Sequence, residues 1–161
     1  MSSTEIVAAI DPGLANCGVL IWDGRRIIAA RTFTSGGDGY RTDFDLAYQR
    51  SRATADDVAE YLLAYHVERA VVEKYRDIPG DLRKARNRWT TPLAIGVLLS
   101  RIDVDGRTII FQDPEYVMTA YSQAKSLWKA GRHGILPGDE LITNDHLRSA
   151  GCHLLSYTAR S

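Results

Sequence analysis

The chain has 161 residues, of which 45% are hydrophobic and 25% are charged. These values suit a globular protein with one domain, residues 1–161, and a core of its own. They exclude a disordered tail, a collagen-like fibre and a low-complexity scaffold. No apolar run approaches the ~20 residues that span a bilayer. Residues 1–5 carry no signal peptide pattern, so we expect a cytoplasmic protein that does not bind membranes.

The distribution of charge says more than its total. Twenty basic and 20 acidic residues cancel, but residues 74–88 contain six basic and two acidic side chains, a local charge of +4. A neutral protein with one concentrated basic segment can bind a polyanion locally. The two cysteines, Cys17 and Cys152, form no CxxC pair. This pattern is typical of a protein in a reducing cytosol. It indicates neither a disulfide framework nor a zinc knuckle.

The first half of the chain predicts three antiparallel strands and a helix. Residues 6–10 form a short apolar run that ends in Asp-Pro-Gly, and residues 18–22 form a second run that ends in Asp-Gly, a hairpin signal. Residues 26–34 predict the third strand. Apolar residues then recur at helical spacing from about residue 43 to residue 66. Residues 69–73 predict a fourth strand.

Helices and strands alternate in the second half. Thr-Pro marks the start of a helix over residues 90–102, and residues 108–111 predict the fifth strand. Asp-Pro-Glu opens a helix that continues to Trp128, and a last helix spans residues 144–158. The order of elements predicts an α/β fold, in which helices flank a mixed five-stranded sheet.

Three acidic residues stand where these elements would bring them together. Asp11 ends the first strand, Glu73 ends the fourth, and Asp145 begins the last helix. If the two strands are neighbours, their carboxylates meet and need a counter-charge. Mg²⁺ prefers oxygen ligands, and two such ions can activate water and stabilise the leaving oxygen of a phosphodiester. The simpler alternatives are a turn residue for Asp11 and a helix N-cap for Asp145.

Two glycines, Gly13 and Gly18, bracket the predicted hairpin loop beside Asp11. Glycine lets a backbone approach a phosphate or a neighbouring strand closely. A plain hairpin is the alternative explanation.

These motifs resemble those of the RuvC-type Holliday junction resolvases. Ile-Asp-Pro-Gly-Leu-Ala-Asn-Cys-Gly, which contains Asp11, is similar to their first motif, and Ala-Val-Val-Glu-Lys-Tyr, which contains Glu73, is similar to their second. Their C-terminal motif has an acid or histidine, an aspartate three residues later, and then alanine. Aligned on Ala150, this chain has His146 and Ser149 at those positions, with Asp145 one residue out of register. The chain looks like a divergent member, of the kind that bacteriophages encode.

The resemblance implies a ribonuclease H-like fold, a homodimer, and nicking of branched DNA that depends on Mg²⁺ or Mn²⁺, with two ions in each active site. Asp11 and Glu73 match the metal-binding acids. Asp145 is the expected third ligand because a hard ion prefers carboxylate to imidazole, while His146 competes for that position or acts on water and the leaving group. Members also place DNA-contacting residues just after the second acid. Here these would be Lys74, Tyr75, Arg76, Arg83, Lys84, Arg86, Arg88 and Trp89.

The basic segment also fits DNA by its own chemistry. Lysine and arginine neutralise phosphates, and exposed aromatic rings stack on unpaired bases. The alternatives are a solvated face for the charges and a core position for Trp89. Lys125, Lys129 and Arg132 recur at helical spacing, and they either follow a second DNA arm or form a solvated face.

The sequence therefore predicts an endodeoxyribonuclease that resolves four-way DNA junctions by paired phosphodiester hydrolysis. Two cuts need two active sites, which a two-fold symmetric dimer supplies. Three alternatives stay open: a broader branched-DNA or flap endonuclease, a non-catalytic DNA-binding module of the same fold, and an actin-like ATPase. The last class pairs two such domains, for which 161 residues leave no room.

Overall fold

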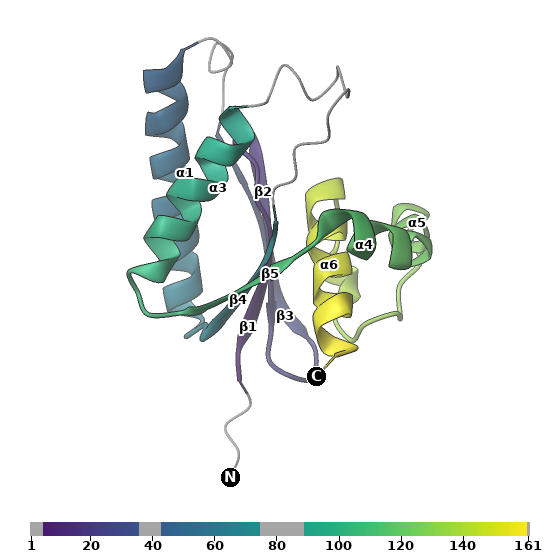
Figure 1. The fold of residues 1–161 in the computed structure, drawn as a ribbon. Helices are drawn as coiled ribbons and strands as arrows, with labels where there is room; N and C mark the ends of the chain where they lie inside the picture. The colour runs from purple at the N-terminus through teal and green to yellow at the C-terminus, as the bar shows by residue number, and fades with distance from the viewer. Residues whose placement is uncertain (1–4, 36–42, 75–88, 161) are drawn as a thin grey trace.

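The computed structural model describes residues 5–35, 43–74 and 89–160. Its strands form one sheet in the order β3-β2-β1-β4-β5 (Figure 1). The first three strands are antiparallel neighbours, and β1, β4 and β5 run parallel to one another. The predicted mixed five-stranded sheet is thus confirmed. The strands are β1 (Val7–Asp11), β2 (Asn16–Trp22), β3 (Ile27–Thr34), β4 (Arg69–Glu73) and β5 (Thr108–Gln112).

Helices cover both faces of the sheet (Figure 1). One face carries α1 (Phe44–Ala64) and α3 (Thr90–Asp103). The other carries α4 (Pro114–Ala120), α5 (Ser122–Lys129) and α6 (Asp145–Thr158), with a 3₁₀ turn at Asp139–Leu141 before α6. Among the residues that the structure describes, none of the helices is long and apolar enough to cross a membrane.

Strand β1 is apolar on both sides because both faces of the sheet are covered. Ala8 and Ile10 belong to the core beneath α1 and α3, whereas Ala9 belongs to the core beneath α6. Since successive side chains of a strand point to opposite faces, Asp11 shares the side of Ala9. The end of β1 therefore presents a carboxylate toward α6.

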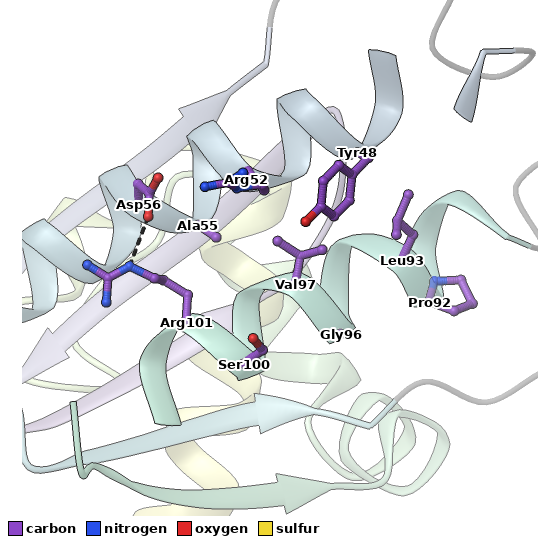
Figure 2. A pocket seen from close by; sticks show the side chains of 10 residues that line it. All are labelled: Tyr48, Arg52, Ala55, Asp56, Pro92, Leu93, Gly96, Val97, Ser100 and Arg101. Atoms are coloured by element: carbon purple, nitrogen blue, oxygen red, sulfur yellow. Dashed lines mark hydrogen bonds and ion pairs between the residues drawn. The ribbon is translucent and has the colours of Figure 1, made fainter. Parts of the chain in front are cut away.

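Helices α1 and α3 lie side by side and leave a groove along their outer surface (Figure 2). At one end of the groove, Arg101 donates from Nε to Oδ1 of Asp56 at 2.8 Å. Tyr48, Pro92 and Leu93 stand at the other end (Figure 2). The ion pair is exposed and adds little to stability, so the register of the two helices depends mainly on the core beneath them.

The prediction of one helix from Asp113 to Trp128 is wrong, because the helix breaks at Tyr121. The backbone of Tyr121, with φ −114° and ψ 19°, lies outside the helical range. The break lets α5 place Trp128 against Gly151 of α6, where an added Cβ would lie 2.8 Å from the indole ring. Hydrophobic spacing continues through the break and so does not reveal it.

A buried carboxylate organises the loop between α5 and α6. Asp139 is 1% exposed and accepts hydrogen bonds from Trp128 Nε1 at 2.9 Å and from the backbone N–H groups of Gly134, Ile135 and Leu136. Burial raises the pKa of Asp139, but these four donors outweigh it, and the pKa lies below its usual value. The loop that leads into α6 is therefore fixed by a charged, fully hydrogen-bonded group.

We expect Asp139→Asn to lower the free energy of unfolding by about 1–3 kcal/mol, since an amide cannot satisfy all four donors. Because the folded pKa is depressed, the contribution of the carboxylate is fully present above about pH 4 and is lost as the pH falls through the folded pKa. Urea unfolding between neutral and acid pH checks this, with the exposed Asp103→Asn as control. If the free energies of unfolding of wild type and Asp139→Asn differ by the same amount at every pH, the charged carboxylate of Asp139 does not have this stabilising role.

Candidate active site

Asp11 and Glu73 lie side by side at the carboxyl ends of two neighbouring strands. β1 and β4 pair in parallel with Ile10 opposite Val72, so the next residue of each strand is an acid. The side chains of Asp11 and Glu73 are 15% and 29% exposed. The structure thus brings together the two carboxylates that the sequence placed at strand ends.

The surroundings of Asp11 disfavour its charged form. Burial is the main cause that raises the pKa of Asp11, and the negative charge of Glu73 raises it further. A hydrogen bond with His146 acts in the opposite direction, but the pKa of Asp11 stays above its usual value. A divalent cation between the carboxylates would remove this cost, and carboxylate oxygens are the ligands that Mg²⁺ prefers. The donor set therefore fits such an ion.

His146, in the first turn of α6, is the third group at this edge. Its Nδ1 lies 2.9 Å from Oδ2 of Asp11, and its side chain is 40% exposed. The hydrogen bond with Asp11 raises the pKa of His146 above its usual value. Asn144 fixes the start of the helix: its Oδ1 accepts from the backbone N–H of His146 at 3.1 Å, and its Nδ2 donates to Oγ1 of Thr32 in β3 at 2.9 Å. The helix start is therefore held over the end of β1.

A glycine makes this approach possible. Gly18 of β2 pairs with Asp11 across the hairpin. An added Cβ on Gly18 would lie 2.6 Å from the carbonyl carbon of His146 and 2.9 Å from its Cβ. The sequence predicted that glycine here admits a phosphate or a strand, but the space beside Gly18 is filled by the start of α6.

Glu73 has its own partner on α6, the fully buried His153. The Nε2 of His153 lies 3.5 Å from Oε2 of Glu73, and its Nδ1 lies 3.0 Å from Oε1 of Gln112 in β5. His146 and His153 are seven residues apart, which places them two turns apart on one face of the helix. Sequence reasoning did not select His153, although this spacing was a signal for it.

Asp145 has a different environment from the two strand-end acids. Its side chain is 69% exposed, and its Oδ1 lies 3.0 Å from Nη1 of Arg148, a contact that lowers the pKa of Asp145. Asp145 is also not the helix N-cap, since Asn144 has that role. Within the described residues, no group of three or more His, Cys, Asp or Glu side chains has the geometry of a metal site. Asp145 as the third ligand stays a prediction.

Most of the predicted DNA-binding segment lies outside the described residues. Lys74 is exposed, and Trp89 is 36% exposed and so does not belong to the core. The Trp89 ring stacks on Phe44 at 5.8 Å, and Phe44 stacks on Tyr48 at 6.4 Å. Sequence reasoning missed Phe44 and Tyr48, whose i, i+4 spacing at a helix start was the signal. The residues outside the described ranges are Tyr75, Arg76, Arg83, Lys84, Arg86 and Arg88.

Similarity to known proteins is found in structure and not in sequence. No protein-family model and no curated protein sequence matches the chain. Thermus thermophilus RuvC in complex with a Holliday junction substrate has 21% identity and a TM-score of 0.71, with 97% of this chain and 95% of that chain covered. Another Thermus thermophilus RuvC structure has 19% identity, a TM-score of 0.63, and coverage of 96% and 95%.

A more distant structural neighbour is the yeast mitochondrial Holliday junction resolvase Ydc2. It has 12% identity and a TM-score of 0.55, with 98% of this chain and 81% of that chain covered. These similarities extend over almost the whole chain and show that it has the RuvC fold, which is ribonuclease H-like. The predicted fold class is confirmed.

We expect Gly18→Ala to push the start of α6 away from β1 and to lower the free energy of unfolding by about 1–3 kcal/mol through overpacking. The pKa of His146 should then fall toward its usual value, because the hydrogen bond with Asp11 is lost. Urea unfolding and titration of the His146 ring resonances by NMR measure both effects. Gly96→Ala is the matched control, since nothing lies within 4 Å of a Cβ added there. Unchanged stability and an unchanged His146 pKa in Gly18→Ala would contradict this role.

Proposed function

We propose that this chain is a metal-dependent, structure-selective endonuclease that resolves Holliday junctions. The observation that carries the proposal is the meeting of Asp11, Glu73 and His146 at one edge of a ribonuclease H-like sheet. Structures with this fold include Holliday junction resolvases, one of them in complex with its junction substrate. Because that likeness concerns the fold, the chemistry of the site has to support the activity.

We assign Asp11 and Glu73 as ligands of Mg²⁺ or Mn²⁺. When bound, the ion supplies positive charge that polarises the phosphodiester and lowers the pKa of a water molecule. The chain's own contribution is to hold the two carboxylates on adjacent strands. A carboxylate only accepts hydrogen bonds, so Nδ1 of His146 donates to Asp11 and fixes the orientation of that carboxylate. His153 lies against Glu73 from within the core.

We further propose that the basic segment and the exposed aromatic rings beside it contact DNA. Lys74 directly follows Glu73 and begins residues 74–88, which carry a local charge of +4, and Trp89 comes directly after them. Positive charge attracts phosphates. The exposed rings of Trp89 and Phe44 offer surfaces on which unpaired bases can stack, as they do where the strands of branched DNA separate. The further residues of the segment are Tyr75, Arg76, Arg83, Lys84, Arg86 and Arg88.

A homodimer in a bacterial cytoplasm completes the proposal. Resolution of a four-way junction requires two cuts related by symmetry, and a two-fold dimer places two sites in a fixed relation. A flap endonuclease of the same fold would need one site, and a non-catalytic module would need none.

The acids are tested directly. Asp11→Asn and Glu73→Gln should each reduce nicking of a synthetic four-way junction by more than about 100-fold, the scale for losing one electrostatic group in an active site. Junction binding should be kept or strengthened, because less negative charge then faces the phosphates. The assay compares Mg²⁺, Mn²⁺ and EDTA, with gel-shift binding in parallel and Asp103→Asn as control.

Other results of this cleavage assay would favour one of the alternative functions or overturn the metal-site assignment. Equal cleavage of junctions, forks and flaps by wild type would favour the broader endonuclease. No nicking with any metal would favour the non-catalytic module. A near wild-type rate in either acid variant would overturn the metal-site assignment.

Variants of two neighbouring residues, Asp145 and His146, test which group acts beside Asp11 and Glu73 as the third metal ligand. The sequence predicts that Asp145→Asn is inactive and that His146→Ala is only slower. The contacts argue for the reverse order, since His146 touches Asp11 while Asp145 is exposed beside Arg148. We therefore expect His146→Ala to lose about 100-fold or more in rate. Asp145→Asn should stay within about threefold, as is usual for an exposed ion pair. Arg148→Ala serves as control for the lost ion pair, and an inactive, folded Asp145→Asn would restore Asp145 as the ligand.

A further inference from the structure

His153 is a fully buried side chain to which the proposed mechanism gives no chemical role. It lies in α6 three residues after Ala150, and so beyond the C-terminal motif that the chain resembles. Its ring reaches the ends of two strands. Nδ1 lies 3.0 Å from Oε1 of Gln112 in β5, and Nε2 lies 3.5 Å from Oε2 of Glu73 in β4. The ring therefore joins the buried amide of Gln112 to an acid of the candidate site.

The contact with Gln112 decides where the ring of His153 carries its proton. A carbonyl oxygen accepts hydrogen bonds and cannot donate them, so Nδ1 of His153 donates to Oε1 of Gln112. In a neutral imidazole the other nitrogen then has a lone pair and no hydrogen. Among the described residues, Nε2 of His153 has no hydrogen-bond partner. The ring thus presents an unprotonated nitrogen to Glu73.

Two atoms with lone pairs therefore face each other at the end of β4. Neither Nε2 of His153 nor a carboxylate oxygen of Glu73 has a hydrogen to share. A buried polar atom without a partner is costly, and such an atom can mark the place of an ion. Bonds of about 2.0–2.2 Å from one ion to a nitrogen and an oxygen leave these two atoms about 3–3.5 Å apart. The observed separation of 3.5 Å suits a shared ion.

The surroundings of His153 match those of a metal-binding histidine. Such a ring donates from its other nitrogen to an oxygen, which fixes the tautomer and the orientation of the ring. Gln112 supplies that oxygen, and the backbone of Gln112 is fixed in turn, since its carbonyl accepts from the N–H of Lys74 at 2.8 Å. The side chain of Glu73 is 29% exposed, so the pair opens to solvent on the side of Glu73.

We propose that Nε2 of His153 is a ligand of the divalent ion that Glu73 binds, and that this nitrogen makes the site prefer Mn²⁺ to Mg²⁺. Mg²⁺ takes oxygen ligands, whereas transition metals also accept imidazole. Such an ion keeps several water ligands, so two protein ligands can bind it although no three described side chains have the geometry of a metal site. The assignment rests on the proposed endonuclease function and deepens it, because it names the ion.

Spin-echo spectroscopy of bound Mn²⁺ detects this ligand without DNA and without turnover. A nitrogen bound to Mn²⁺ modulates the echo, and labelling with ¹⁵N-histidine changes the modulation if that nitrogen belongs to histidine. Wild type should show a coordinated histidine nitrogen, and His153→Leu should lose it. His146→Ala should keep it, which separates the two histidines of the site. His66→Asn removes an exposed imidazole elsewhere and serves as control. A wild type without the signal, or a His153→Leu protein that keeps it, would overturn the assignment.

Calorimetric titration with each ion tests the preference for Mn²⁺. Wild type should bind Mn²⁺ at least about tenfold more tightly than Mg²⁺. His153→Leu should lose about tenfold or more in Mn²⁺ affinity and keep its Mg²⁺ affinity, because only Mn²⁺ uses the nitrogen. Gln112→Leu leaves the ring unheld and should lower Mn²⁺ affinity by about tenfold. A structural role of His153 would lower both affinities alike, and that result would overturn the assignment.

Thermal unfolding identifies any variant that fails to fold, and His153→Gln then replaces His153→Leu, since an amide offers no imidazole nitrogen. The two proposals fail in different ways. A wild-type protein that cuts no DNA with any metal overturns the proposed function. A wild-type protein that cuts junctions, but whose bound Mn²⁺ shows no histidine nitrogen, leaves that function intact and overturns the assignment of His153.

Discussion

The approach of the first turn of α6 to the end of β1 is the constraint on which the rest of the site depends. Strand pairing puts Gly18 opposite Asp11, and the missing side chain leaves room for the backbone of His146. Asn144 caps the helix and bonds to Thr32 of β3, so the helix start is tied to the sheet. Once the start of α6 is fixed, its helical period decides which later side chains meet the acids.

The segment before α6 fixes the same helix from its other side. Asp139 gathers the indole of Trp128 and three backbone N–H groups around one buried carboxylate. The ring of Trp128 in turn rests on Gly151, where α6 has no side chain to keep it away. Buried hydrogen bonds are costly to leave unmade, so α5 and α6 stay fixed relative to each other. A hydrogen bond from Lys125 of α5 to Ser149 of α6 depends on that relation.

The electrostatics of the site follow from placing two carboxylates on adjacent strands. Burial and the charge of Glu73 raise the pKa of Asp11, so a positive charge beside Asp11 would favour its ionised form. A negatively charged phosphodiester beside the two carboxylates would disfavour their charged forms further. His146 approaches from the start of α6, which packs over the end of β1, and its Nδ1 lies 2.9 Å from Oδ2 of Asp11.

The sequence by itself determined the strands of the sheet and the helices that flank it, because apolar runs closed by turn residues are local patterns. It also placed Asp11 and Glu73 at the ends of two strands, since each acid directly follows such a run. It did not reveal the break at Tyr121, since hydrophobic spacing continues across it. For the third ligand it favoured Asp145 over His146 on ligand chemistry alone, and no local pattern shows which of the two side chains faces Asp11. Neighbouring residues at a helix start point about 100° apart, and only the packing of α6 on β1 decides which of them faces Asp11. Contacts between elements distant in the chain leave no local pattern, which is why only the tertiary structure placed Lys125 beside Ser149.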